Sequence, residues 1–246
     1  MKKILNVNGF EFEAEYSDAE VSTILIPLLE KMTALHDSKK ERIVVFLAAP
    51  PAVGKTTLAV FLEKLSQEKS EFCEIQHLSL DGFHHKSNYL KEHKINYLGD
   101  DIYLNDIKGM PETFDYDKFL MYLKKLKSSN DKWPIYDRKS HDVIEEVVEI
   151  TKDVVLIEGN WLLLDEERWN QLVKYCDLSI FIEANKTMLK ERLVNRKLQG
   201  GLSYDAALDF YERSDKKNIQ RVLKNRIKAD INLSMVKNGE KMKLQK

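Results

Sequence analysis

The stretch of residues 46–57 constrains the fold more than any other part of the chain, because it joins an apolar run to a Gly-Lys-Thr turn. An apolar run before such a turn and an amphipathic sequence after it predict a buried strand, a tight loop and a helix. Backbone N–H groups at the start of that helix converge on one point and favour an anion there. The Lys55 ammonium and the Thr56 hydroxyl are suited to the phosphates and the Mg²⁺ of a nucleoside triphosphate. The stretch therefore predicts a phosphate-binding loop in an α/β fold.

The loop departs from the common pattern G-x-x-x-x-G-K-[ST] at its first position, where Ala49 replaces glycine. Pro50 and Pro51 remove two backbone donors, so the cradle must be formed by the amides that follow them. The expected phosphate-binding residues are Ala52, Val53, Gly54, Lys55, Thr56 and Thr57. The competing interpretation is an ordinary strand, proline turn and helix that carry a chance Gly-Lys-Thr sequence.

Composition and charge limit the classes of protein to which the chain can belong. Its 246 residues are 43% hydrophobic, which suits one α/β domain with a full core. The 39 basic and 40 acidic side chains nearly cancel, so the sequence predicts no nucleic-acid partner. No apolar run approaches the ~18 residues needed to span a bilayer, and the first residues lack the apolar core of a signal peptide. We therefore expect a cytoplasmic protein with no membrane partner.

Residues 1–40 predict an extension that precedes the phosphate-binding domain. Alternating residues from Ile4 to Tyr16, with Asn8-Gly9 at the turn, predict a β-hairpin whose second strand buries one face. The sequence Ser17-Asp-Ala-Glu20 resembles a capping box, and the apolar spacing after it predicts a helix to about residue 36. The hairpin either covers an edge of the sheet or pairs with a second subunit, which would make a homodimer.

Residues 41–236 alternate short apolar runs with amphipathic segments, which predicts a three-layer α/β/α domain with a mostly parallel central sheet. The expected strands are residues 43–48, 74–79, 154–157, 178–182 and 231–235. The expected helices are residues 55–66, 116–127, 166–175, 186–197 and 204–226. Residues 82–150 are interpreted as an insertion that carries a substrate site, residues 186–202 as a helical lid, and residues 237–246 as a solvated basic tail.

Two of the expected strands lead into a carboxylate, Asp81 and Glu158. Because ligands of an open parallel sheet bind outside the carboxyl ends of its strands, both side chains are expected at the crevice of the phosphate loop. Asp81 is then placed to accept the proton of an attacking hydroxyl. Glu158 is placed to hold Mg²⁺ together with Thr56, either directly or through a water. The alternatives are an Asp-Gly turn without chemistry at Asp81 and a helix N-cap at Glu158.

Arg192 and Arg196 lie four residues apart and share one face of an expected helix. The Gly200-Gly201 pair behind them predicts a flexible joint. A basic face on a mobile helix can close over a transferring phosphoryl group and neutralise its oxygens. The alternative is a solvated charged helix that takes no part in the chemistry.

In their order and spacing, these elements resemble the phosphoribulokinase/uridine kinase family of P-loop small-molecule kinases, which also includes bacterial pantothenate kinases. The resemblance covers about Arg42 to Leu233. The segments that carry it are residues 49–57, 81–84, 109–115, 134–138, 157–160, 191–196 and 228–230. No single segment is decisive, but their order and spacing together are specific to the family.

The resemblance implies a P-loop NTPase fold and a kinase that uses ATP and Mg²⁺. In that family the aspartate of the D-G-F or D-S-F element is taken as the base, which corresponds to Asp81. The glutamate of the E-G element assists Mg²⁺ and corresponds to Glu158, and the lid arginines correspond to Arg192 and Arg196. With Lys55 of the phosphate loop, these residues form the expected catalytic set.

The phosphate acceptor is harder to assign from the sequence. Tyr136 and His141 match the P-x-Y-D-F-x-x-H element that contacts the base in uridine kinases, but Arg138 replaces its aromatic residue. An arginine there suits an acceptor that bears a carboxylate, a phosphate or several hydroxyls better than a stacked pyrimidine. Arg138 therefore leaves the class of acceptor open.

Two histidines follow the expected base directly and carry two interpretations. His84 and His85 can hydrogen-bond a polar acceptor and so belong to the substrate site. Equally, one of the two rings packs against Trp161 or Tyr103 and has a structural role. Neither histidine belongs to a sequence pattern that binds a metal.

Together these residues favour an ATP-dependent kinase that transfers the γ-phosphate to a hydroxyl of a small polar metabolite, such as a nucleoside, a sugar or a pantothenate-like compound. One alternative is a nucleotide-dependent NTPase switch, although the chain lacks the Asn-Lys-x-Asp element that reads guanine. The other is a nucleotide-binding module without turnover. It is prompted by Ala49 and Ala52, which replace small flexible glycines.

Overall fold

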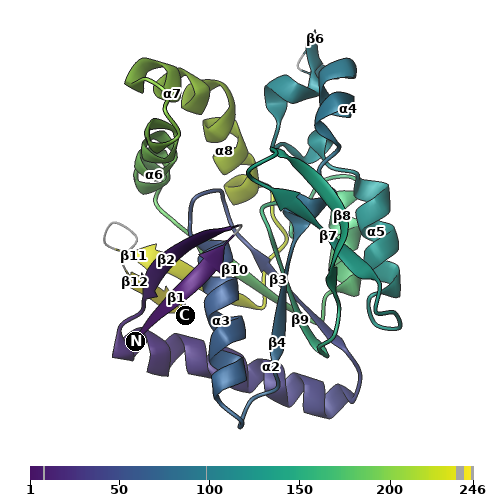
Figure 1. Cartoon of the computed structure of the whole chain (residues 1–246), viewed down its shortest axis with the longest axis vertical. Helices are drawn as coiled ribbons and strands as arrows, with labels where there is room; N and C mark the ends of the chain where they lie inside the picture. The colour runs from purple at the N-terminus through teal and green to yellow at the C-terminus, as the bar shows by residue number, and fades with distance from the viewer. Residues whose placement is uncertain (8, 98, 237–240, 245–246) are drawn as a thin grey trace.

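The computed structural model describes residues 1–7, 9–97, 99–236 and 241–244, and a six-stranded sheet runs through its centre. The sheet order is β12-β11-β10-β3-β9-β4, and every neighbouring pair is parallel except β11 and β12 (Figure 1). Its strands are β3 (Ile43–Ala48), β4 (Ile75–Ser79), β9 (Val154–Gly159), β10 (Leu178–Glu183), β11 (Ile231–Val236) and β12 (Lys241–Leu244). The mostly parallel sheet expected from the sequence is confirmed.

Both faces of the sheet are buried, and β3 at its centre is apolar at every position. In β3, residues 43, 45 and 47 pack into one apolar cluster, and residues 44, 46 and 48 pack into a second cluster on the opposite face. The first cluster includes side chains of α2 (Ile26–Lys39) and α3 (Lys55–Glu68), and the second includes side chains of α5 (Tyr116–Lys125). The result is the three-layer α/β/α arrangement that the alternating pattern predicts.

Three helices rise above the carboxyl end of the sheet, at the upper left of Figure 1: α6 (Lys186–Gln199), α7 (Tyr204–Phe210) and α8 (Lys216–Lys224). The helix expected over residues 204–226 is confirmed from Tyr204 to Lys224, with a π-helical turn (Tyr211–Asp215) between α7 and α8. The helix expected over residues 166–175 is wrong: only the short 3₁₀ segment Trp169–Tyr175 forms there. Among the described helices, none has the length and apolar character needed to cross a membrane.

The N-terminal extension forms an antiparallel hairpin of β1 (Lys2–Val7) and β2 (Phe10–Glu15), followed by α1 (Asp18–Glu20), the π-helical turn Val21–Leu25 and α2. The capping box is confirmed, since Ser17 and Glu20 exchange both of its hydrogen bonds. The expectation that β2 buries one face is wrong. Phe10 and Phe12 are 58% and 38% exposed, and only Ala14 of that face is fully buried. Asn8 of the expected turn lies outside the described residues.

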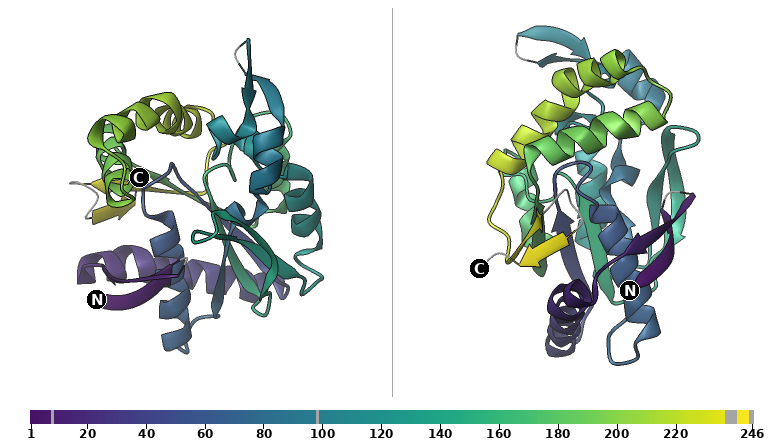
Figure 2. Two further views of the ribbon diagram at one scale, coloured as in Figure 1. Left: turned by 45° about the horizontal axis from the view of Figure 1, so that its top comes forward. Right: turned by 90° about the vertical axis from the view of Figure 1, so that its left-hand side faces the viewer.

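The insertion after β4 contains two hairpins that the sequence analysis does not predict. Its elements are η2 (Leu80–Phe83), α4 (Ser87–Glu92), β5 (Lys94–Tyr97), β6 (Asp100–Tyr103), η3 (Leu104–Ile107), η4 (Pro111–Thr113), α5, β7 (Lys132–Asp137) and β8 (Asp142–Glu149). Figure 2 shows these elements on one side of the carboxyl end and α6 to α8 on the other; we call these three helices, which include the expected lid of residues 186–202, the lid helices. At the other end of the chain, residues 241–244 are expected in a solvated tail but form β12, where Met242 is buried.

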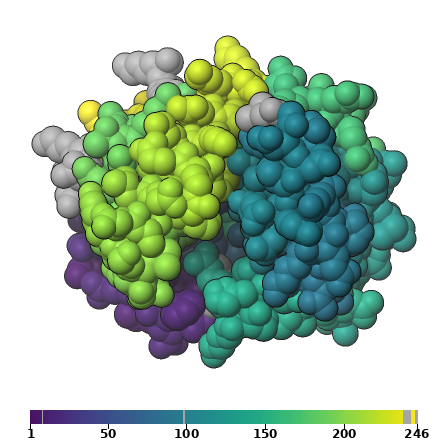
Figure 3. Space-filling view, turned by 90° about the horizontal axis from the view of Figure 1, so that it is seen from above, coloured from purple at the N-terminus to yellow at the C-terminus, as the bar shows by residue number. Residues whose placement is uncertain are grey.

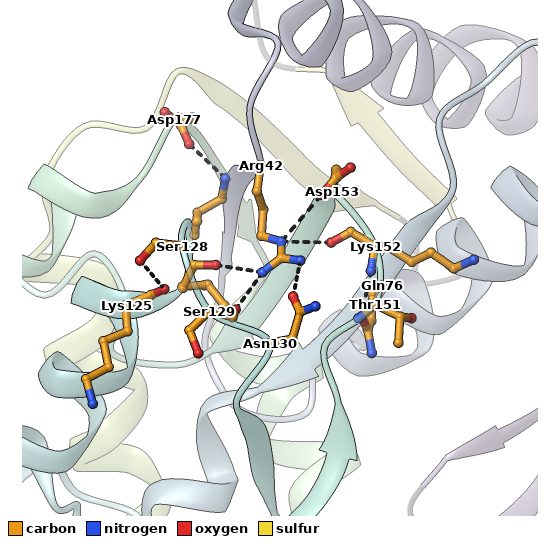
Figure 4. Close-up of polar contacts among 12 residues, drawn as sticks. Arg42, Gln76, Lys125, Ser128, Ser129, Asn130, Thr151, Lys152, Asp153 and Asp177 are labelled. Carbon is orange, nitrogen blue, oxygen red and sulfur yellow. Dashed lines mark hydrogen bonds and ion pairs between the residues drawn. The ribbon is translucent and has the colours of Figure 1, made fainter.

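A dense polar network closes the amino end of the sheet around Arg42 (Figure 4). Arg42 donates from Nε to the Lys152 carbonyl at 3.0 Å and from Nη1 to the carbonyls of Leu126 and Ser129 at 2.9 and 2.7 Å. Its Nη2 donates to Asn130 Oδ1 at 2.8 Å. One guanidinium thereby joins the end of α5 and the segment before β9 to the first residue before β3.

Candidate active site

The phosphate-binding loop leaves β3 and turns sharply into α3. Gly54 caps the helix with a φ of 100°, a left-handed conformation that glycine adopts without steric cost. Ala52 is also left-handed, with a φ of 64°, although it has a Cβ. Strained backbone of this kind is typical of functional loops. The conformation directs the first amides of α3 toward the carboxyl end of the sheet, where an anion is favoured.

Glu158, at the carboxyl end of β9, is the centre of the polar contacts below this loop. Its Oε1 accepts hydrogen bonds from Thr56 Oγ1 at 3.1 Å and from Ser79 Oγ at 2.8 Å. Lys55 Nζ lies 3.6 Å from Oε2, and His77 Nε2 lies 3.9 Å from Oε1. The pairing of β9 with both β3 and β4 brings these side chains together, because Glu158 lies opposite Ser79 in the strand register.

The surroundings keep Glu158 ionised although it is only 2% exposed. Burial by itself raises its pKa, but the Lys55 ammonium, His77 and Ser79 outweigh burial and lower the pKa to about 2. Within the described part of the chain, Oε2 has no hydrogen-bond partner. An ionised carboxylate whose Oε2 accepts no hydrogen bond, beside the Thr56 hydroxyl, fits a hard cation such as Mg²⁺, which prefers oxygen ligands.

Asp81 lies in η2, two residues beyond the end of β4. Its backbone N–H donates to Ser79 Oγ at 3.2 Å, which is the same hydroxyl that donates to Glu158. The next residue must be glycine, because a Cβ at Gly82 would lie 2.0 Å from the carbonyl oxygen of Pro134 in β7. This close approach brings Asp81 beside the strand that leads to Tyr136.

Arg196 of α6 interacts electrostatically with both Arg138, in the insertion, and Asp81. The pKa of Arg196 is lowered by burial and by repulsion from Arg138, while Asp215 and Asp81 act in the opposite direction. Arg196 nevertheless keeps an exposed side chain, so these charges surround a space that is open to solvent. The structure therefore brings together three of the residues expected from the sequence.

Arg192 instead contacts the phosphate loop itself. Its Nη1 donates to the carbonyl oxygens of Ala52 and Val53 at 3.1 and 3.2 Å, and burial lowers its pKa. The two lid arginines are thus divided between two places, one at the loop and one near Asp81. Their spacing of four residues on α6 allows a single helix face to reach both.

His84 belongs to an aromatic wall beside Asp81. Its ring stacks on Phe114 at 3.8 Å and meets the edge of Tyr136 at 5.7 Å. Burial lowers the pKa of His84 to about 4, although Asp81 raises it, so the ring is neutral near pH 7. Its Nδ1 lies 3.3 Å from the Thr113 carbonyl, which favours the tautomer with the proton on Nδ1 and a free lone pair on Nε2.

The other two histidines of the expected substrate site are placed differently. His85 stacks on Tyr89 at 4.3 Å, and the ring contacts described for His84 and His85 include neither Trp161 nor Tyr103, the partners of the alternative interpretation. His141 lies in the exposed turn between β7 and β8 with a φ of 55°. Its described hydrogen bonds use the backbone carbonyl, and none joins its imidazole to the groups around Asp81.

Several residues of the site are missing from the sequence analysis. His77 and Ser79 contact Glu158, and the signal for them is that they lie two positions apart and so share one face of β4. Asn218 of α8 is 5% exposed, and its Oδ1 has no hydrogen-bond partner among the described residues. No local pattern marks Asn218, because its burial depends on how the lid helices pack.

The space-filling view from above shows a hollow between the lid helices and the insertion (Figure 3). The two sides come from residues far apart in the sequence, α6 to α8 on one side and α4 to β6 on the other. Three charged residues come from different parts of this hollow: Asp81 from η2, Arg138 from the β7–β8 turn and Arg196 from α6. Arg196 interacts electrostatically with the other two.

Comparisons with known proteins agree with this geometry, although no family model matches the chain. A protein of Escherichia coli (strain K12) with the name "Uncharacterized protein YggC" is 42% identical over 97% of this chain and 98% of its own length. "Putative uridine kinase C227.14" of Schizosaccharomyces pombe is 28% identical over 80% of this chain and 85% of its own.

A solved structure of a protein with a kinase name is also similar to this chain. The crystal structure of a "putative fructose transport system kinase" from Silicibacter sp. TM1040 superposes with a TM-score of 0.75 at 30% sequence identity. It covers 85% of this chain and 98% of its own. With the phosphate loop, the strand-end carboxylates and the lid arginines in the expected order, the chain belongs to the phosphoribulokinase/uridine kinase family of P-loop small-molecule kinases.

Proposed function

We propose that this kinase transfers the γ-phosphate of ATP to a hydroxyl group of a small polar acceptor that carries an anionic group. The observation that supports it most is a continuous set of hydrogen bonds across three strand ends. Thr56 Oγ1 and Ser79 Oγ both donate to Glu158 Oε1, and the Asp81 N–H donates to Ser79 Oγ. The groups suited to bind the donor phosphates and the group suited to act as base are therefore held in one rigid arrangement.

The donor phosphates would bind to the amides of residues 52–57 and to the Lys55 ammonium. Thr56 and Glu158 would hold Mg²⁺, which supplies positive charge against the phosphate oxygens. Arg192, already at the loop, would neutralise the same oxygens from the lid side. Phosphoryl transfer requires mainly positioning and charge neutralisation, which these groups would supply.

In the transfer step, Asp81 would accept the proton of the acceptor hydroxyl as its oxygen forms a bond to the γ-phosphorus. The bond from the γ-phosphorus to the bridging oxygen breaks, and ADP leaves with that oxygen. Arg196 would offset the charge that spreads over the transferring group. The neutral His84 ring, with its Nε2 lone pair, would accept a hydrogen bond from a second polar group of the acceptor.

The preference for an anionic acceptor rests on Arg138. The names of the relatives point to different acceptors, so we infer the class of acceptor from residues of this chain. Arg138 is exposed in the turn before β8 and repels Arg196, whose pKa it lowers. A carboxylate or phosphate between the two guanidinium groups would relieve this repulsion and accept hydrogen bonds from both.

The test is phosphate transfer from ATP to acceptor pairs that differ only in charge, such as pantothenate against pantothenol and glycerate against glycerol, with nucleosides and neutral sugars alongside. We expect the anionic member of a pair to be preferred, and Arg138→Gln to reduce that preference. Asp81→Asn should lower kcat about 10²- to 10⁴-fold, the usual contribution of a general base. Undiminished transfer by that variant would exclude Asp81 as the base.

Two other outcomes would favour the alternatives. Hydrolysis of ATP that no acceptor accelerates, with a protein partner retained only in the triphosphate state, would favour a nucleotide switch. Binding of ATP without transfer to any acceptor would favour a nucleotide-binding module. The left-handed Ala52 in the loop makes this second outcome worth measuring directly.

A further inference from the structure

A second cavity of about 200 Å³ lies on the other side of the phosphate loop from Asp81 and Glu158. Val53, Gly54 and Thr57 of the loop and of α3 form one wall. Opposite them are Ile182, Met235 and Met242, which belong to β10, β11 and β12. In the sheet these strands lie on one side of β3, whereas β9 and β4, which lead to the two carboxylates, lie on the other.

The remaining wall comes from the N-terminal extension, which the family resemblance does not cover. Phe12, Ala14, Glu15 and Tyr16 of the hairpin segment, together with Glu20, line the cavity. Phe12 is 38% exposed although it is aromatic, so its ring presents apolar surface that no part of the described chain fully covers.

The hairpin is fixed relative to the phosphate loop by contacts with α3, the helix that the loop begins. Lys64 Nζ donates to the Ile4 carbonyl at 2.7 Å, and Lys3 forms an ion pair with Glu68. The Tyr16 ring meets the edge of the Phe61 ring at 4.6 Å.

The wall is closed at its far side by Glu20. One of its carboxylate oxygens accepts hydrogen bonds from Ser17, and the other accepts from the Met242 N–H at 2.9 Å. This side chain, 6% exposed, ties the start of the first helix to β12. The two ends of the described chain therefore meet at the cavity.

We infer that this cavity holds the nucleoside part of the phosphate donor and that the N-terminal hairpin forms its outer wall. The inference rests on the proposed function, in which the donor phosphates bind at the start of α3. The side toward β9 and β4 is needed for the acceptor and the base, so the rest of the nucleotide leaves the loop toward β10 to β12. The cavity begins there, at Gly54 and Thr57.

The chemistry of the walls suits a purine nucleoside. Thioether and aromatic side chains present polarizable surface to a flat ring. The Glu15 carboxylate offers an acceptor for a hydroxyl or an amino group. Arg192 lines the cavity as well as contacting the phosphate loop, so it stands at the junction between phosphates and nucleoside.

The test separates the nucleoside from the phosphates by using two ligands with Mg²⁺: a non-hydrolysable ATP analogue, and inorganic tripolyphosphate, which has no base. Calorimetric titration of the full chain gives the Kd of each. We expect Phe12→Ala to weaken the ATP analogue about tenfold, as removal of an aromatic ring beside a base does, and to leave tripolyphosphate unchanged. Phe12→Tyr keeps the ring and should retain the affinity of the unaltered protein.

Phe10→Ala is the matched control, because Phe10 lies two residues earlier on the same face of β2 but does not line the cavity. A second variant, Met235→Trp, fills the cavity from the sheet side and should weaken the ATP analogue at least as much as Phe12→Ala, again without effect on tripolyphosphate.

Equal affinity of Phe12→Ala and Phe10→Ala for the ATP analogue, with no loss in Met235→Trp, would overturn the inference and leave the proposed function intact. Loss of both ligands to the same degree would also overturn it, because the hairpin would then act only through the phosphate loop. An unaltered protein that binds neither ligand would overturn the proposed function itself, and this inference with it.

Discussion

The two ends of the central sheet both contain buried ionic groups, but only one end satisfies them. At the amino end, Arg42 donates from all three guanidinium nitrogens to protein oxygens. Asp177 there accepts from the Val44 N–H and pairs with Lys39 and Lys127. At the carboxyl end, Glu158 Oε2 has no hydrogen-bond partner within the described chain.

The difference separates charges that hold the fold together from charges that await a ligand. A buried ionic network stabilises a structure only when each member is satisfied, and an incomplete one costs free energy. The amino end is complete, so its groups need nothing from solution. The carboxyl end keeps an ionised carboxylate and two mutually repelling arginines, Arg138 and Arg196, in one place. A bound nucleotide, metal ion and acceptor would complete it.

The largest expected effect separates activity from stability at the carboxyl end. We expect Glu158→Gln to lower kcat about 10²- to 10³-fold, the usual loss when a charge that stabilises the transition state is removed. The free energy of unfolding should also fall, because Lys55, His77 and Ser79 stabilise the ionised carboxylate that the variant removes, but the loss in kcat should remain when it is expressed per folded molecule. Steady-state kinetics with the acceptor that transfers best and urea denaturation check the two parts.

If Glu158→Gln unfolded the protein while kcat per folded molecule stayed unchanged, the proposed difference between the two ends of the sheet would be wrong. Glu158 would then have the structural role that Arg42 has at the other end. Measuring the Mg²⁺ concentration for half-maximal rate in the same variant adds a separate check, because the loss of a metal ligand should raise it.

Arg42→Ala should give the opposite result. The change leaves the carbonyls of Leu126, Ser129 and Lys152 without their donor, and we expect the free energy of unfolding to fall by about 3 kcal/mol. The Kd of the ATP analogue should not change in the folded protein. Arg213→Ala is the control, since that arginine is exposed and its ion pair with Asp209 is at the surface. A loss of nucleotide affinity without a loss of stability would contradict the division between the two ends.

The sequence predicts the core of the fold well because its central strands and first helix have strong local signals. β3 is apolar at all six positions and has the bounds expected for it. Ser17 and Glu20 form the expected capping box because both partners are close in sequence. The hairpins β5–β6 and β7–β8 have weaker signals, since their strands are short or largely exposed and lack a clear alternation. Their formation depends on neighbours that the local sequence does not show.

For the site, the sequence shows which side chains end a strand but not which side chains lie opposite them. Glu158 can be anticipated because it follows an apolar run, whereas Ser79 becomes its partner only through the register of β4 with β9. The surroundings of His84 are also decided by tertiary packing, because Phe114 and Tyr136 come from separate segments of the insertion. The sequence therefore predicts which residues belong to the site more reliably than it predicts which side chains they contact.

Gly82→Ala tests how the carboxyl end depends on close backbone approach. A Cβ there would lie 2.0 Å from the Pro134 carbonyl oxygen, so β7 or η2 must move. We expect the free energy of unfolding to fall by about 2 kcal/mol, within the usual range for overpacking. Because Asp81 and Arg138 lie on the two segments that separate, the acceptor KM should rise while tripolyphosphate binds normally. Gly200→Ala is the control, since its φ of −78° suits alanine and the nearest atom to an added Cβ lies 3.4 Å away, and a similar rise in acceptor KM there would contradict this explanation.

The smallest expected effect is on the pH dependence of the free energy of unfolding, which should differ between the two ends of the sheet. Burial lowers the pKa of His84 to about 4, so as pH falls below 6.5 the unfolded chain takes up a proton before the folded chain does. Stability present above pH 6.5 is therefore lost toward pH 4, and between pH 7 and 5 the loss should be about 1 to 2 kcal/mol.

The stabilisation that Asp177 gives at the amino end is lost over a different range of pH. Burial alone would raise its pKa, but its lysine partners and the Val44 N–H lower it, so its stabilisation is lost only at pH values below the ordinary carboxyl range. Urea midpoints at pH 7 and pH 5 should thus shift less for His84→Gln than for the unaltered protein. The exposed His141→Gln is the control and should keep the full shift. Equal shifts in all three proteins would mean that the aromatic wall beside Asp81 is not the source of the loss.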